Sequence, residues 1–182
     1  MNNYWIRHVA GALVWTVVLT TLLNCQSPAT DRKAADEQDI LASVIRYQME
    51  EWVREGDKNQ ADAKTKSDRS IASALNFRVF FISLNGKDPT DEFLNRFRDI
   101  PRSIRKVSSE YPQKGPHTPR DRTSDLTGII FSADNVTWLN TDAVEVEGGY
   151  YCGGLCAAGM TYRVQREGGK WVVKTSRTKW IS

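Results

Sequence analysis

The chain has 182 residues, of which 40% are hydrophobic, 26% charged and 10% aromatic. This composition is that of a globular protein and excludes a collagenous, intrinsically disordered or multi-span membrane chain. The formal net charge of +3 is too small to indicate nucleic acid as a partner. The length corresponds to one domain preceded by a targeting segment.

The first 24 residues have the pattern of a secretory signal peptide. Arg7 is the only Lys, Arg, Asp or Glu side chain before Cys25, and it precedes an apolar run from Val9 to Leu23. Such a run is about 22 Å long as a helix, which is shorter than the roughly 30 Å hydrocarbon core of a bilayer. We therefore expect residues 1–24 to be an export signal and residues 25–33 to be a polar tether.

The apolar run ends in Leu22-Leu23-Asn24-Cys25, which resembles the lipobox of bacterial lipoproteins. In that family the cysteine is diacylated and becomes the mature N-terminus, so the resemblance implies lipidation of Cys25 and a membrane anchor facing the periplasm or exterior. The sequence departs from the family at Asn24, where Gly, Ala or Ser is usual. Two alternatives stay open: cleavage after Ala29, which would give a soluble secreted protein, and an uncleaved anchor.

The cysteine count is consistent with lipidation. The chain contains 3 cysteines, an odd number for an exported protein. Lipidation of Cys25 would leave Cys152 and Cys156 to pair across a hairpin tip. Redox motifs usually have two residues between the cysteines at a helix start, and zinc needs about four ligands. We expect a structural disulfide, with redox activity, a metal site and two free thiols as the alternatives.

Apolar residues recur at three- and four-residue spacing from Ala34 to Glu55, which predicts an amphipathic helix. Asp36 is the expected N-cap and Gly56 the expected stop. The charged segment 57–70 is either a solvated second helix or a loop. A dense β-type run then extends from Phe77 to Leu84.

A short helix is predicted to open at Asp88-Pro89-Thr90-Asp91, with acidic side chains at its positive end. Its expected buried side consists of Phe93, Leu94, Phe97 and Ile100. Residues 103–109 are a possible strand. Residues 110–125 contain three prolines and are expected to form a long surface loop.

The last third of the chain has the signals of strands. Helices followed by such strands indicate the α+β class. We expect N-terminal helices packed on a curved antiparallel sheet that ends in a three-stranded meander. All of these elements are expected to belong to one domain of residues 34–182. This order of elements resembles the nuclear-transport-factor-like fold over most of the mature chain, which implies a curved sheet wrapped on helices. The expected strands are residues 128–133, 136–139, 142–151, 160–166 and 171–175.

The two C-terminal hairpins have a definite expected register. If Cys152 faces Cys156, Val144 lies opposite Val164 and Glu145 opposite Arg163. If Gly168-Gly169 is a two-residue turn, Val164 lies opposite Val173 and Arg163 opposite Lys174. Burial of the valine row should enforce this pairing, and a bulge at Gly148-Gly149 is the expected exception.

No catalytic, cofactor-binding or metal-ligating residue is predicted. His117 is the only histidine after the signal segment and is expected to be exposed in a loop. Glu145 and Glu147 alternate with valines and should face solvent.

The sequence favours a binding or structural role. The membrane is an expected partner through the lipid anchor, and an envelope protein, an anionic glycan or an anionic lipid is a possible further partner. Nucleic acid is not an expected partner. Residues 95–122 carry eight Lys or Arg against three Asp or Glu, which provides an anionic-surface hypothesis. The main alternative is a small-ligand or enzymatic pocket within the curved sheet. The side chains expected to line it are Phe77, Phe80, Trp138, Tyr150 and Trp171.

Overall fold

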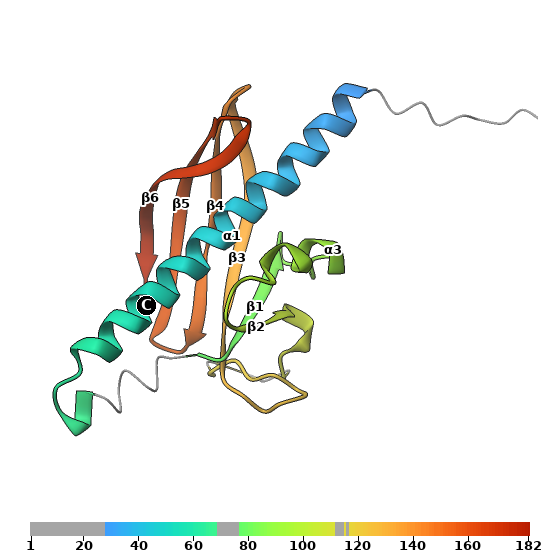
Figure 1. Cartoon of the computed structure of the whole chain (residues 1–182). Helices are drawn as coiled ribbons and strands as arrows, with labels where there is room; N and C mark the ends of the chain where they lie inside the picture. Colours follow the sequence, from blue (N-terminus) through green and yellow to red (C-terminus); the bar gives the residue numbers. More distant parts are fainter. Residues whose placement is uncertain (1–27, 69–76, 112–114, 116) are drawn as a thin grey trace, which may run out of the picture.

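The structure is a computed structural model that describes residues 28–68, 77–111, 115 and 117–182. It is an α+β fold in which one long helix, α1, crosses one face of a six-stranded sheet (Figure 1). The strand order is β2-β1-β3-β4-β5-β6, so that β2 and β6 are the edges. The α+β class predicted from the sequence is confirmed, with a single long helix instead of several packed on the sheet.

The helix α1 spans Pro28–Asp62 and is longer than the sequence predicted. It begins within the expected tether and continues past Gly56, so Gly56 is not a helix stop and Asp36 is not an N-cap. Asp36 instead links the helix to the sheet: one oxygen pairs with Arg166 and the other accepts a hydrogen bond from Trp171 Nε1 at 3.2 Å. The buried side of the helix consists of Ile40, Leu41, Val44, Ile45 and Met49.

The sheet is mixed, which corrects the expectation of an antiparallel sheet. β1 (Val79–Leu84) runs parallel to both β2 (Ser103–Lys106) and β3 (Gly128–Asn140). The chain makes this possible by crossing back after β1 through a helical connection, as parallel strands require. β3, β4 (Ala143–Gly153), β5 (Cys156–Glu167) and β6 (Lys170–Ile181) form an antiparallel meander that contains the three strands predicted to end the chain.

The connection between β1 and β2 holds α3 (Asp91–Leu94) and the 3-10 turn η1 (Asn95–Phe97). Thr90 caps α3, because its hydroxyl oxygen accepts a hydrogen bond from the backbone N–H of Phe93 at 3.2 Å. Phe93, Phe97 and Ile100 are buried, as predicted, whereas Leu94 is only partly buried. The possible strand 103–109 divides into β2 and the 3-10 turn η2 (Val107–Ser109).

The predicted valine row is confirmed. Val144 faces Val164, and Val164 faces Val173, so Val164 lies between the other two. Gly168 and Gly169 have φ values of 54° and 80°, the positive values that a type I′ hairpin turn requires at both central positions. The turn and the buried row therefore set the same register.

One predicted pair in the second hairpin is wrong. Arg163 faces Thr175, because Lys174 is an extra residue without a partner on β5. The Lys174 ammonium bonds Glu167 Oε1 at 2.7 Å. The bulge expected at Gly148-Gly149 is absent from the β4–β5 ladder, whose register is continuous from Ala143 to Tyr151.

The edge strand β6 carries a second bulge of the same kind. Lys179 is skipped in the pairing with β5 and its ammonium bonds Glu147 of β4. Bulges and lysines on an edge strand interrupt the row of free backbone groups and so oppose pairing with another chain. Both interruptions of β6 are thus occupied by a lysine that is neutralised within the sheet.

Candidate functional site

A cavity of about 320 Å³ lies between the C-terminal half of α1 and the inner face of the sheet. We call it the inner cleft. Aromatic side chains form its walls, with Tyr47 and Trp52 coming from the helix and Phe131, Tyr150 and Tyr162 from strands β3, β4 and β5. Its remaining lining residues are Gln48, Glu51, Glu55, Gly56, Asn59, Met160 and Ser176.

The rings of the inner cleft meet edge to face. Trp52 lies 5.0 Å from Tyr150 and 6.3 Å from Phe131 between ring centroids, and Tyr47 lies 6.0 Å from Tyr162. Each pair is T-shaped, with interplanar angles of 63–71°. The rings around the cavity therefore differ in orientation. The face of an aromatic ring carries negative electrostatic potential, which attracts cations.

The charged groups of the inner cleft are carboxylates. Glu51 pairs with Arg54 on the solvent side, whereas Glu55 makes no ion pair with any described residue. None of the lining residues is Lys, Arg or His. Burial raises the pKa of the Tyr162 phenol, so its hydroxyl stays protonated over the physiological range. The cleft is therefore aromatic, with a negative rim.

The chain's own cations cover aromatic rings elsewhere in the fold. The Arg166 guanidinium lies 4.6 Å from the Trp171 ring centroid, and Lys33 lies 5.8 Å from that of Trp138. Arg46 and Arg96 cover two phenylalanines of the α3–η1 segment. No such cation lies over a ring of the inner cleft among the described residues. Phe131 and Tyr162 are almost fully buried, whereas Tyr47, Trp52 and Tyr150 are only partly buried, so an external cation can reach these three rings.

The five aromatic residues predicted to line a pocket divide into two groups. Phe77, Phe80 and Trp171 are buried, and Trp138 packs on Trp171 at 5.6 Å, so these four belong to the packed core beneath α1. Tyr150 alone lines the inner cleft. Sequence analysis did not identify the other four rings as site residues, because their spacing is also that of a buried core.

The predicted pairing of Cys152 and Cys156 is present in the structure as a disulfide, with a Cα–Cα distance of 5.2 Å. It closes the tip of the β4–β5 hairpin, where Gly153 faces Cys156. Cys152 is buried, and Leu155 at the tip is 93% exposed. The bond joins two strands that are already paired, which is consistent with the structural role expected from the spacing.

His117 is less exposed than predicted, because its ring is held on both sides. Nε2 lies 2.6 Å from Glu110 Oε1, and Nδ1 lies 2.8 Å from the Gly115 carbonyl oxygen. The side chains of His117 and Glu110 are 19% and 14% exposed. The Tyr151 hydroxyl bonds the backbone of His117, which fastens this loop to β4. The sequence did not identify Glu110 as the partner.

Glu145 and Glu147 lie on the partly exposed face of β4, as predicted. Glu145 faces Arg163 at 3.8 Å in an ion pair whose side chains are both about two-fifths exposed. Hydrogen bonds from Lys179 and Asn135 lower the pKa of Glu147, which is opposite to the shift that a general acid requires.

The cations of the basic segment 95–122 are largely engaged within the chain. Arg96 pairs with Asp39 at 2.6 Å, Lys106 with Asp91 at 2.8 Å and Arg120 with Asp125 at 2.8 Å. Arg105 and Arg122 contact Asp121 and the Glu110 carbonyl, and Lys114 lies outside the described residues. The anionic-surface hypothesis stays a prediction, with less unpaired charge than the sequence indicates.

No protein-family model matches the chain, and no significant match was found among curated proteins or solved structures. The resemblance to the nuclear-transport-factor-like fold stays a prediction. Within the described ranges, no helix has the length and hydropathy needed to span a membrane, and no three potential metal ligands are grouped. Cys25 and the signal segment lie outside the described residues.

Proposed function

We propose that this protein is an exported, lipid-anchored domain of the cell envelope that binds a small organic cation in the inner cleft. The lipobox-like sequence ending at Cys25 supports the export and the anchor. The binding role rests on one observation: an aromatic cavity with a carboxylate rim in which no described cation of the chain occupies the ring faces.

The chemistry of the inner cleft selects a particular type of head group. A quaternary or alkylated ammonium is attracted by the ring faces and needs few hydrogen-bond acceptors, and aromatic cages are the usual protein sites for it. Glu55, which makes no ion pair with any described residue, adds long-range attraction at the entrance. A cavity of about 320 Å³ is at the small end of ligand sites in proteins, which suits a trimethylammonium group with a short chain.

The same lining argues against other ligand classes. An anion would meet the unpaired carboxylate of Glu55 and no Lys, Arg or His among the lining residues. A purely apolar molecule would leave the phenol groups of Tyr47, Tyr150 and Tyr162 without an electrostatic partner. The lining includes Ser176 but no histidine or lysine to activate its hydroxyl, so binding is the better supported role.

The test compares choline with 3,3-dimethyl-1-butanol, which has the same shape but carries no charge. Each is titrated into the exported protein by calorimetry, in a polyoxyethylene detergent that contains neither sugar nor ammonium. We expect choline to bind at least about tenfold more tightly, because cation–π attraction contributes roughly 0.5–2 kcal/mol per ring. Equal affinities, or no binding of either molecule, would contradict the proposal.

Two variants assign the binding to the inner cleft. Trp52→Leu removes the ring that contacts both Tyr150 and Phe131 and should raise the choline Kd by about tenfold. Glu55→Gln removes only a charge and should raise the Kd by a factor of about two to five. Trp138→Phe is the matched control, because the Trp138 ring already lies beside Lys33, and it should leave the choline Kd unchanged.

A further inference from the structure

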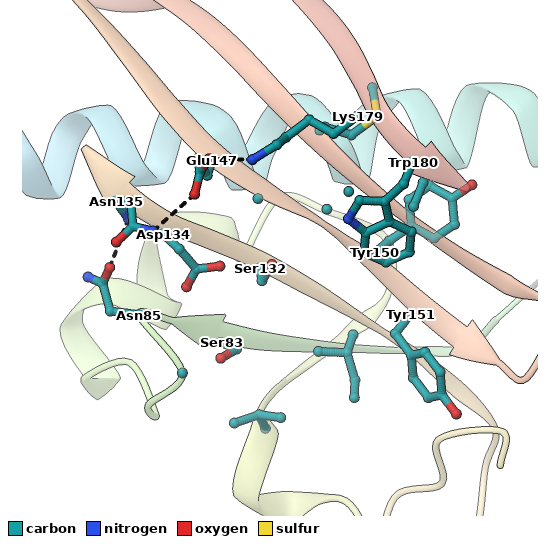
Figure 2. A pocket seen from close by; sticks show the side chains of 18 residues that line it. Ser83, Asn85, Ser132, Asp134, Asn135, Glu147, Tyr150, Tyr151, Lys179 and Trp180 are labelled. Atoms are coloured by element: carbon teal, nitrogen blue, oxygen red, sulfur yellow. Dashed lines mark hydrogen bonds and ion pairs between the residues drawn. The ribbon is translucent and has the colours of Figure 1, made fainter. Parts of the chain in front are cut away.

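A second hollow, of about 710 Å³, lies on the face of the sheet opposite α1 (Figure 2). We call it the outer groove. Its polar side chains alternate along the strands with residues of the core: Ser132 and Asp134 flank the buried Ala133 on β3. Alternation along a strand places them on the other face, and Figure 2 shows α1 passing behind the sheet.

Two strand bulges shape the outer groove around Glu147. Asn135 is the extra residue on β3, with φ of 48°, and Lys179 is the extra residue on β6. Asn135 Nδ2 donates to one Glu147 oxygen at 3.0 Å, and Lys179 donates to the other. The backbone N–H of Asn135 donates to Asn85 Oδ1 at 3.0 Å. The bulged residues are therefore held in place before any ligand arrives.

Beside this network lies a row of polar groups without partners. Ser83 and Ser132 are paired positions on the parallel strands β1 and β3, and Asp134 is two residues further along β3. Ser83 is only 8% exposed and Asp134 is half-buried. None of the three side chains makes a hydrogen bond with any described residue. These side chains line the groove, so their hydroxyl and carboxylate oxygens are available to a ligand that carries hydroxyl groups.

The other side of the groove offers a flat apolar surface. Trp180 is 53% exposed, and its indole lies directly on Gly159: a Cβ at Gly159 would fall 2.3 Å from Trp180 Nε1. Gly149, also in the groove, has φ of 157° and leaves no room for a side chain against the Ala158 carbonyl. Figure 2 shows Trp180 and the row of Ser83, Ser132 and Asp134 around the same hollow.

We propose that the outer groove binds a neutral saccharide. A sugar ring presents hydroxyl groups along its edge, which hydrogen-bond to serine and carboxylate oxygens, and C–H groups on its face, which pack on an indole. An anionic ligand does not fit, because Asp134 and Glu147 outnumber Lys179, whose charge Glu147 already neutralises. A fully apolar ligand would leave the row of Ser83, Ser132 and Asp134 unsatisfied.

The test uses an array of neutral oligosaccharides, including glucans, galactans and oligomers of N-acetylglucosamine, probed with the fluorescently labelled exported protein. Affinity for any retained glycan is then measured by calorimetry. We expect Trp180→Ala to weaken it about tenfold or more and Asp134→Asn to weaken it severalfold. Gly159→Ala should weaken it as well, because the new methyl group displaces the indole.

Leu155→Ala, at the exposed hairpin tip, is the matched surface control and should bind like the parent protein. Thermal melts of all variants separate loss of binding from loss of folding, and Asp134→Asn keeps the test valid if Trp180→Ala fails to fold. The proposal is overturned if no neutral glycan is retained, or if binding persists unchanged in both Asp134→Asn and a folded Trp180→Ala. Glu55→Gln, at a residue that lines only the inner cleft, should not change glycan binding, so the two sites are tested independently.

Discussion

His117 illustrates how a single side chain fixes a loop. Both of its ring nitrogens face oxygen acceptors, Glu110 Oε1 and the Gly115 carbonyl. Each oxygen accepts a hydrogen bond only from a ring nitrogen that carries a proton, so the doubly protonated, cationic ring satisfies both contacts. The hydrogen bond to Gly115 and that to Glu110 accordingly raise the pKa of His117.

This geometry predicts how stability depends on pH. The unfolded pKa of histidine is about 6.5, and the folded pKa of His117 is higher. The stabilisation is therefore complete below about pH 6.5 and is lost as the pH rises through the folded pKa. The difference in unfolding free energy between the parent and His117→Gln should shrink between pH 6 and pH 9, as chemical denaturation at several pH values would measure.

His117 is also the only histidine after residue 24, so NMR of the processed protein follows one imidazole titration. A midpoint above 6.5 is expected, and a midpoint below it would contradict the assigned pairing. The partner could not be predicted from the sequence. The sequence between Glu110 and His117 contains two prolines, and no periodicity indicates that their side chains meet.

At the scale of elements, the valine row provides the clearest stability prediction. Val164 is fully buried between Val144 and Val173, so Val164→Ala should lower the unfolding free energy by about 2 kcal/mol. Val172 lies on the other face of β6 and is 39% exposed. Val172→Ala should cost less than about 0.5 kcal/mol, and denaturant titration of both variants checks the difference.

The disulfide prediction concerns the β4–β5 hairpin. Closing a loop of this size contributes about 2 kcal/mol on the chain-entropy model, and the ladder from Ala143 to Tyr151 holds the register without it. Replacing Cys152 and Cys156 together by serine should therefore lower stability by no more than about 2 kcal/mol and preserve the fold. Circular dichroism checks the fold, and urea unfolding measures the loss of stability. A double variant that does not fold would contradict the claim that the strand pairing holds the register without the disulfide.

Hairpin register could be predicted from the sequence because two turns and one buried row agree on it. A shift of one residue would place charge in the valine row, so burial selects one pairing. The bulges could not be predicted in the same way. An extra residue such as Lys174 leaves the buried row intact, and only its contact with Glu167 distinguishes the bulged strand from a regular one.

At the scale of the whole molecule, both candidate sites depend on relations that local sequence does not encode. The parallel placement of β1 between β2 and β3 brings Ser83 beside Ser132. The inner cleft forms where residues 47–59 of α1 face Phe131, Tyr150 and Tyr162 of three different strands. Aromatic residues at helical and strand spacing indicate burial equally well, so their periodicity cannot distinguish a core from a cavity wall.

The proposed anchor and the inner cleft lie at opposite ends of α1. Trp52 is roughly 36 Å along the helix from Pro28 at 1.5 Å per residue, and Cys25 closely precedes Pro28. The lipid should therefore hold the protein on the membrane without affecting choline binding. Cys25→Ser should release the protein from the membrane fraction or block its processing while leaving the choline Kd of the folded protein unchanged. A mature N-terminus at Thr30 would contradict lipidation.

The most direct test of the central claim is the intermolecular NOE spectrum of the protein with saturating choline. A cation held in the inner cleft places its N-methyl protons against ring protons of Trp52, Tyr150 and Tyr162. We expect NOEs between the trimethylammonium resonance and these three rings, and their loss in Trp52→Leu. NOEs only to Trp138, Trp171 or Trp180, or none at saturation, would contradict the account.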